Sequence, residues 1–160
     1  MSKGDLARLI ASIVICLLPG IAGSAVTVAA VSQWYPTLVK PFFSPPSWIF
    51  GPVWTILYLM MGISLFLIWQ KDPLTSGRKK ALYIFAVQLI LNAAWSPVFF
   101  GLRSIVGGMI LITLLWLSIG LVIYTFDRIS RKAALLLVPY FLWVSFASVL
   151  NFSLLILNCP

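Results

Sequence analysis

Histidine is absent from the 160-residue chain, and charged side chains are scarce. Only 3 residues are acidic, and 9% are charged, against about 25% in a typical soluble domain. The missing histidine removes the commonest ligand of protein-bound metals and haem and the commonest general base. The two cysteines, Cys16 and Cys159, are expected at well-separated depths, which argues against a disulfide framework. We therefore expect no metal site, no obligatory cofactor and no ordinary acid–base catalysis.

Hydrophobic residues make up 62% of the chain and are grouped into long runs. Each run has about the 20 residues that a helix needs to cross a bilayer, and lipid forces every backbone polar group to bond within its own helix. The sequence therefore predicts an all-α integral membrane protein, a five-transmembrane-helix bundle that forms a single domain over 1–160. The predicted helices are about 6–31, 47–69, 81–100, 104–126 and 133–157.

The first apolar run has an alternative interpretation as a secretory signal. Lys3 and Arg8 precede its apolar core, and Ala22-Gly23-Ser24-Ala25 is similar to a cleavage site. The run continues past that site to Val31, which favours a membrane span.

The net charge of +8 is unevenly placed along the chain. Lys40 and Arg103 fall in the first and third breaks between the runs. The other nine basic residues fall at the N-terminus and in the second and fourth breaks: Lys3, Arg8, Lys71, Arg78, Lys79, Lys80, Arg128, Arg131 and Lys132. Five spans put these two groups on opposite sides of the membrane, so the positive-inside rule predicts a cytoplasmic N-terminus and an outer C-terminus. We interpret the basic loops as topology signals and contacts for anionic lipid, not as a nucleic-acid site.

Rigid turns and amphipathic rings are concentrated in residues 34–62, which read WYPTLVKPFFSPPSWIFGPVWTILYLMMG. This stretch holds five of the ten prolines and three of the seven tryptophans. Its first part belongs to the connection 32–46, which is longer than the roughly 4 to 6 residues usual in compact domains. We predict that this connection is a lid on the outer face, with Trp34, Lys40 and Phe43 as lid residues. An interfacial aromatic belt is the alternative.

Amide and aromatic side chains share one face of the third predicted helix. Gln88, Asn92, Trp95 and Ser96 follow the spacing i, i+4, i+7, i+8 of a single helix face. Amides are costly against lipid, so this face is expected to point into the bundle. Taken alone, it is typical either of contacts between helices or of a cavity lining.

The fifth predicted helix repeats this combination of aromatic, small and amide residues. Tyr140, Trp143, Ala147 and Asn151 lie at i, i+3, i+7 and i+11 on one face.

Polar and aromatic groups from three predicted helices reach similar depths in the membrane. In the second helix, the face that begins at Trp54 continues to Tyr58. At about 1.5 Å rise per residue, Trp54, Asn92 and Asn151 lie roughly 9 to 15 Å below the outer surface. Because the predicted lid lies above them, this convergence favours a ligand cavity over contacts between helices.

Three segments resemble the signature sequences of the TspO/MBR family, the tryptophan-rich sensory and translocator proteins. The segments are residues 34–62, QLILNAAWSPVFF at 88–100 and LVPYFLWVSFASVLN at 137–151. The resemblance covers nearly the whole chain in order and spacing. It implies a five-helix membrane fold, commonly a homodimer, that binds porphyrins such as protoporphyrin IX and haem. In some members it also implies binding of cholesterol and synthetic benzodiazepine-site ligands.

The family's ligand pocket lies among helices one, two, three and five, beneath the first loop. By motif, its residues match Trp54, Asn92, Trp95, Trp143 and Ala147 of this chain. Some bacterial members degrade bound porphyrin in light, and the two tryptophans associated with that activity match Trp54 and Trp143.

Two positions depart from the family pattern. Phe43 stands where the first loop usually carries a tryptophan. Phe152 stands where the cholesterol motif of animal members needs a tyrosine, and no basic residue follows within the next three positions. Recognition of a sterol through that motif is therefore not expected.

The sequence thus predicts a membrane receptor or carrier for porphyrins and similar lipophilic ligands. Aromatic faces suit the flat macrocycle, and amide and phenol groups suit its polar edges. The predicted ligand-binding residues are Trp54, Tyr58, Asn92, Trp95, Tyr140, Trp143, Ala147 and Asn151. Lys40 of the loop is a candidate partner for a propionate.

Two alternative functions follow from the same residues. One is a light- and oxygen-dependent porphyrin-degrading enzyme, in which Trp54 and Trp143 are the catalytic residues. The other is a transporter of a small lipophile, which is disfavoured because the predicted spans contain no acidic residue or histidine to couple ions to transport.

Overall fold

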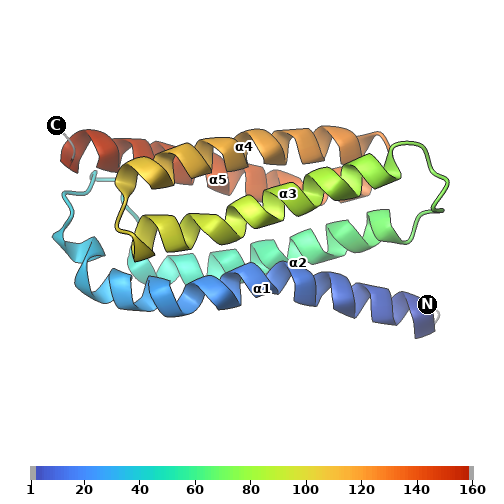
Figure 1. Ribbon diagram of the computed structural model, residues 1–160, viewed down its shortest axis with the longest axis horizontal. Helices are drawn as coiled ribbons and strands as arrows, with labels where there is room; N and C mark the ends of the chain where they lie inside the picture. Colours follow the sequence, from blue (N-terminus) through green and yellow to red (C-terminus); the bar gives the residue numbers. More distant parts are fainter. Residues whose placement is uncertain (1–2, 159–160) are drawn as a thin grey trace.

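The computed structural model describes residues 3–158, apart from the side chain of Ala25, and Cys159 lies outside this range. Five antiparallel helices run up and down along one axis (Figure 1). They are α1 (Lys3–Gln33), α2 (Phe50–Trp69), α3 (Arg78–Ser96), α4 (Ile105–Asp127) and α5 (Arg131–Asn158). All five are long and apolar enough to cross a membrane. The predicted fold class, an all-α bundle of five membrane-spanning helices, is confirmed, and the chain is a multi-pass membrane protein.

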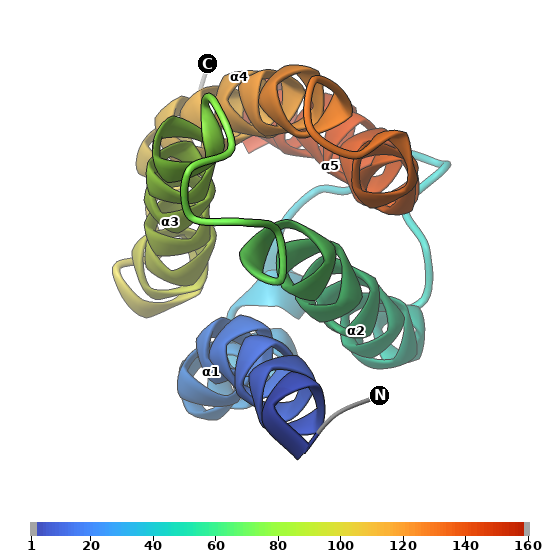
Figure 2. The same cartoon turned by 90° about the vertical axis from the view of Figure 1, so that its right-hand side faces the viewer.

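The helices form a ring in the order α1, α2, α5, α4, α3 (Figure 2). One end of the bundle, which we call the basic end, carries the N-terminus and the two turns at 70–77 and 128–130. The other end, the loop end, carries the long connection 34–49, the turn at 102–104 and the end of α5. The orientation predicted from the basic residues, with the loop end as the outer end, stays a prediction.

The basic half of the bundle is tightly packed. A Cβ atom on Gly62 of α2 would lie 2.7 Å from the Cα atom of Ile13, so α1 and α2 are in backbone contact there. The Ser64 hydroxyl donates to the Ala133 carbonyl at 2.8 Å and ties α2 to α5. Phe85 and Phe126 stack at 5.6 Å between α3 and α4. Small residues that allow such approach are typical of helix packing in membranes.

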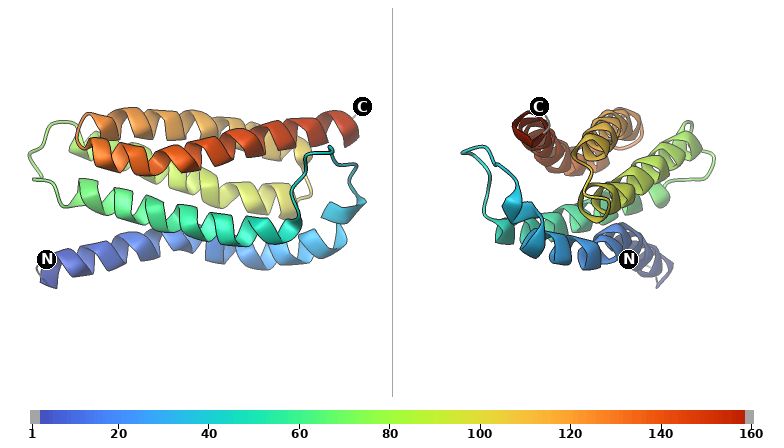
Figure 3. Two further views of the ribbon diagram at one scale, coloured as in Figure 1. Left: turned by 180° about the vertical axis from the view of Figure 1, so that it is seen from behind. Right: turned by 60° about the vertical axis from the view of Figure 1, so that its left-hand side comes forward.

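Proline shapes two of the helices. Pro19 lies inside α1, which is bent near its middle (Figure 3). Pro97 follows α3, which begins at Arg78 and ends as an α-helix at Ser96. Beyond it, Pro97–Gly101 form a π-helical turn, in which the Leu102 amide donates to the Pro97 carbonyl at 2.9 Å. Because Pro97 has no N–H to continue the α-helical ladder, the turn widens and aims the following aromatic residues into the bundle.

The connection 34–49 crosses the loop end and is fastened to α5. It contains two short 3₁₀ turns, Tyr35–Thr37 and Ser47–Ile49. Val39 donates from its amide to Oδ1 of Asn158 at 2.9 Å, and Nδ2 of Asn158 donates back to the Val39 carbonyl at 2.9 Å. This paired contact fixes the middle of the connection above the last turn of α5.

Candidate functional site

A cavity of about 690 Å³ lies in the loop half of the bundle. All five helices and the connection 34–49 contribute to its lining. Its volume falls within the roughly 300 to 1,000 Å³ of typical small-molecule sites. The tight packing of the basic half ends at the cavity floor, where Gly20 of α1 packs against the Tyr58 ring so closely that a Cβ would lie 2.5 Å from it.

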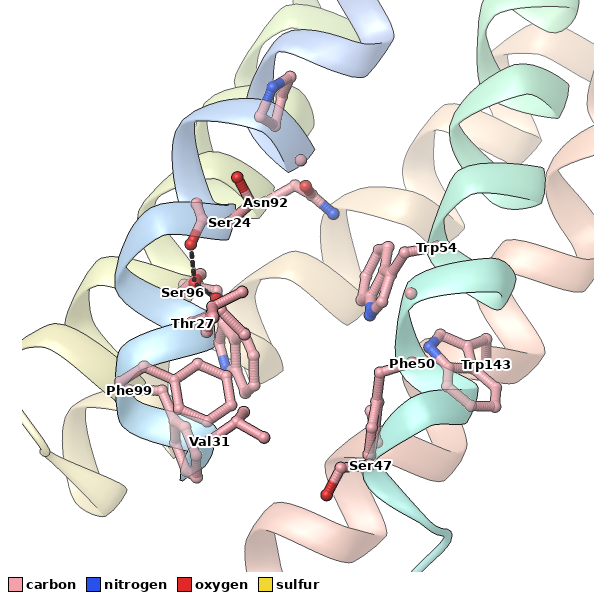
Figure 4. Close-up of a pocket in the computed structure, with 18 of the residues that line it drawn as sticks. Ser24, Thr27, Val31, Ser47, Phe50, Trp54, Asn92, Ser96, Phe99 and Trp143 are labelled. Atoms are coloured by element: carbon pink, nitrogen blue, oxygen red, sulfur yellow. Dashed lines mark hydrogen bonds between the residues drawn. The ribbon is translucent and has the colours of Figure 1, made fainter. Parts of the chain in front are cut away.

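Two aromatic walls face each other across this cavity. Figure 4 shows Trp54, Phe50 and Trp143 on one side and Phe99 on the other. The Trp95 ring stacks on Phe99 with centroids 4.9 Å apart and an angle of 11° between the planes. A cavity between flat aromatic faces favours a flat, apolar ligand.

Each aromatic wall is held by further contacts. The indole N–H of Trp95 donates to the Gly108 carbonyl of α4 at 3.1 Å, which fixes the ring plane. On the opposite wall, Trp54 stacks on Tyr58 at 5.4 Å, and Phe50 packs edge-on to Trp143 at 6.0 Å. Rings that are fixed before binding lose little conformational entropy when a ligand enters.

A buried chain of hydrogen bonds leads from the cavity floor into the bundle. The Tyr58 hydroxyl donates to Oδ1 of Asn92 at 2.9 Å, and Nδ2 of Asn92 donates to the Tyr140 hydroxyl at 2.9 Å. The Tyr140 hydroxyl donates in turn to Oε1 of Gln88 at 3.1 Å. The polar face of α3 therefore connects α2, α3 and α5, and Asn92 also lines the cavity. Asn92 therefore both connects helices and lines the cavity, which are the two interpretations that the sequence left open.

Replacing Tyr140 with phenylalanine is expected to lower the free energy of unfolding by about 1 to 3 kcal/mol, because two buried amides lose a partner. Thermal unfolding in detergent, followed by circular dichroism, measures the change. Tyr124→Phe is the matched control, since its hydroxyl is exposed and accepts a hydrogen bond from Arg128 at 3.0 Å. Equal melting temperatures for the two variants would contradict a structural role for this chain of hydrogen bonds.

Asn151 differs from Asn92 in its hydrogen bonding. Its side chain is only 2% exposed and lines the cavity. Neither Nδ2 nor Oδ1 has a hydrogen-bond partner among residues 3–158. The indole N–H of Trp143, on the same helix face, is likewise buried and unpaired within this range. Buried polar groups are normally hydrogen-bonded, so both side chains are exceptions within the part of the chain that the structure describes.

Most of the predicted ligand-binding residues come together in the structure. Tyr140 does not line the cavity and lies behind Asn92. The other seven do line it: Trp54, Tyr58, Asn92, Trp95, Trp143, Ala147 and Asn151.

None of the three predicted lid residues lines the cavity. Trp34 packs edge-on against Phe99 at 5.5 Å, and the Lys40 ammonium lies 4.5 Å from the centre of the Tyr35 ring. The Phe43 ring packs edge-on against Phe146 of α5 at 6.3 Å. Within the connection 34–46, the cavity wall is formed by Tyr35. A lid role for these three residues stays a prediction.

The family resemblance implied that the first helix borders the pocket, but no residue of α1 was among the predicted ligand-binding residues. Gly20, Gly23, Ser24 and Thr27 line the cavity, and Thr27 shares a hydrogen bond with Ser96 of α3. In the sequence, this small-residue face, spaced i, i+3, i+4 and i+7, is equally typical of tight helix packing. What distinguishes the two uses is the partner helix, which the sequence does not specify.

The cavity opens sideways between α1 and α2. Its lining on α3, α4 and α5 contains only buried or half-buried residues. The exposed lining residues all come from α1, from the 3₁₀ turn Ser47–Ile49 or from the first turns of α2: Ile21, Ser24, Val28, Ser32, Ser47, Trp48, Gly51 and Thr55. Because both helices span the membrane, a lipophilic ligand has a route to the cavity from within the bilayer.

The lining carries no formal charge among the residues that the structure describes. Within the same residues, no group of three or more His, Cys, Asp or Glu side chains is placed to hold a metal ion. The arrangement can enclose a flat lipophile and form hydrogen bonds with it, but the lining offers no carboxylate or histidine for acid–base chemistry.

Sequence comparison relates the chain to known proteins. The sequence profile of the TspO/MBR family matches residues 12–157. The chain is 49% identical to the tryptophan-rich protein TspO of Chlorobaculum tepidum over 148 residues, which cover 90% of this chain and 91% of that protein. It is 43% identical to the protein of the same name from Archaeoglobus fulgidus, over 96% and 99% of the two chains. It is also 40% identical to the translocator protein of Bos taurus, over 84% and 80%.

Proposed function

Because the chain belongs to the TspO/MBR family, we propose that it is a membrane receptor or carrier that binds porphyrins, such as protoporphyrin IX, and similar lipophilic molecules in the cavity. The observation that carries this proposal is the uncharged cavity of about 690 Å³ between the Trp95–Phe99 stack and the Trp54–Trp143 wall. A porphyrin is a flat apolar disc, and such walls bury both of its faces. The chain has no histidine to ligate haem iron, so the ring is recognised and not the metal.

We also propose that the site lies in the outer half of the membrane. Arg78, Arg128 and Lys132 lie at the basic end, and by the positive-inside rule they support a cytoplasmic location for that end. The cavity then opens toward the outer leaflet, and the basic turns contact anionic lipid on the cytoplasmic side.

Replacing Trp54 and Trp143 together with phenylalanine is expected to weaken protoporphyrin IX binding by about tenfold, because indole contact area and two N–H donors are lost. Titration of the porphyrin Soret band with purified protein measures the affinity. Trp116→Phe serves as the control, since Trp116 stacks on Phe141 outside the cavity. An affinity that is the same in the double variant and the control would place the binding site elsewhere.

A second candidate function is light-dependent oxidation of the bound porphyrin with molecular oxygen. Trp54 stacks on Tyr58 at 5.4 Å and meets the Tyr140 ring edge-on at 6.1 Å, so three oxidisable rings lie in contact beside the cavity. These rings are suited to donating an electron to an excited porphyrin. Illumination in air should then bleach the Soret band faster with this protein than with the Trp54→Phe, Trp143→Phe variant, and equal rates would exclude this activity.

A further inference from the structure

The helices α1 and α2 are in contact in the basic half of the bundle and apart in the loop half. Gly51 and Gly62 lie about three helical turns apart on α2, so they face nearly the same direction. A Cβ on Gly62 would lie 2.7 Å from the Cα atom of Ile13 on α1, whereas a Cβ on Gly51 would have nothing within 4 Å. The two helices therefore separate between these levels.

The separation leaves an opening into the cavity beyond the contact between Gly20 and Tyr58. In Figure 4, Ser24 of α1 and Ser47 before α2 lie on opposite sides of the cavity. We call this opening the lateral mouth, and its residues are the exposed members of the cavity lining: Ile21, Ser24, Val28, Ser32, Ser47, Trp48, Gly51 and Thr55.

The hydroxyl groups at the lateral mouth are bonded within their own helices. Ser24 and Ser32 donate to carbonyl groups of α1 at 2.7 and 3.0 Å, and Thr55 donates to a carbonyl group of α2 at 2.9 Å. Such bonds satisfy the hydroxyl donors locally. A lipophile that passes these three side chains therefore breaks no hydrogen bond between helices.

The boundary between α1 and α3, on the other side of α1, is closed. Thr27 shares a hydrogen bond with Ser96, and a Cβ on Gly23 would lie 3.2 Å from the Ser96 side chain. Farther toward the loop end, a Cβ on Gly101 would lie 3.1 Å from Val26. The cavity lining on α3, α4 and α5 contains only buried or half-buried residues, so these helices form its closed walls.

The loop end is closed by a packed apolar cluster beneath the connection 34–49. The buried members of this cluster are Tyr35, Phe99, Ile105, Leu150 and Leu154. The two hydrogen bonds between Val39 and Asn158 hold the connection above it. Passage of a ligand at this end would break both bonds and expose the apolar cluster to water, which is unfavourable. Passage through the lateral mouth requires neither.

We propose that the lateral mouth is the entrance of the site, so that a ligand dissolved in the bilayer passes between α1 and α2 while the connection 34–49 stays in place. This inference rests on the proposed function. It assigns to the site a class of ligand, flat lipophiles that partition into the hydrocarbon of the membrane. It also makes Val28 and Gly51, on the two sides of the mouth, the positions that control how fast a ligand exchanges.

Narrowing the lateral mouth tests the proposal. Gly51→Trp, and Val28→Trp from the side of α1, should each lower the association and dissociation rate constants of protoporphyrin IX by about tenfold, because a narrower entrance slows passage in both directions. The affinity should change little. Stopped-flow measurement of the Soret band, with the protein in lipid nanodiscs, gives both rate constants. Ile56→Trp is the control, since Ile56 is exposed on α2 and does not line the cavity.

Asn158→Ala tests passage at the loop end, because it removes both hydrogen bonds that hold the connection. The rate constants of this variant should equal those of the unmodified protein. If neither mouth variant slows dissociation relative to Ile56→Trp, or if Asn158→Ala accelerates association and dissociation together, the entrance is wrongly assigned and the porphyrin site stands. If the unmodified protein binds no protoporphyrin IX, the proposed function and this inference both fail.

Discussion

Replacing Gly62 with leucine is expected to prevent stable assembly of the bundle. A side chain at this position meets the Cα, N and Cγ1 atoms of Ile13 at 2.7 to 3.1 Å, and two of these three atoms belong to the backbone. A backbone cannot move aside as a flexible side chain does, so α1 and α2 would have to separate. We expect a loss of about 3 kcal/mol or more in the free energy of unfolding, at the upper end of overpacking effects.

The measurement is thermal and denaturant unfolding in detergent, together with size-exclusion chromatography. Gly51→Leu is a matched control on the same helix, because a Cβ there has nothing within 4 Å. Both variants gain the same intrinsic helix propensity, so the difference between them reports the contact with α1. Equal stability of the two variants would mean that α1 and α2 are not in backbone contact.

Replacing Ala147 with tryptophan is expected to abolish high-affinity porphyrin binding and leave the bundle folded. Ala147 lines the cavity between Trp143 and Asn151 on α5, so an indole at this position occupies the space between the aromatic walls. Loss of that space should lower the affinity by at least about a hundredfold, which corresponds to about 2.7 kcal/mol.

The control for this substitution is Phe152→Trp, which adds an indole to an exposed position of the same helix. Soret titration measures affinity, and circular dichroism verifies that both variants are helical. Undiminished binding by Ala147→Trp, with the fold retained, would show that the porphyrin does not occupy this cavity.

The fold class followed from the sequence because lipid leaves few choices. Apolar runs of bilayer length, separated by short polar breaks, have to become helices, and each of the five predicted runs contains one of the five long helices. Residues 47–49 of the second run form a 3₁₀ turn, and residues 97–100 of the third belong to a π-helical turn. Where the structure departs from the predicted helix ranges, the cause is local. The third predicted helix runs to residue 100, but the α-helix ends at Ser96 because Pro97 has no N–H to continue it, and Pro97–Gly101 form a π-helical turn.

The candidate site was predictable where chemistry constrains it. An amide in a membrane helix has to find polar partners, so the faces containing Asn92 and Asn151 could be identified from spacing alone. The sequence could not reveal that Asn92 is engaged and Asn151 is not, because that difference depends on which helix lies opposite each residue. Tyr140 shares its helix face with Trp143, yet it bonds to Gln88 and Asn92 behind the cavity.

The α1 wall was the least predictable part of the site. Glycine, serine and threonine at helical spacing allow close packing or leave room for a ligand. In this chain the same helix does both: beyond Gly20 it lines the cavity, and at Ile13 it touches the backbone of α2. The change from one use to the other takes place near Pro19, where α1 is bent.

The paired hydrogen bonds between Val39 and Asn158 have a consequence for the order in which the protein is built. They join positions 119 residues apart, one following the first helix and the other in the last turn of the fifth. A chain that is synthesised from its N-terminus therefore carries its first connection unfastened until α5 has been inserted. Asn151 and Trp143 also arrive with α5. The cavity is completed and covered in the same final step of membrane insertion, so a four-helix intermediate has no finished site in which to hold a ligand.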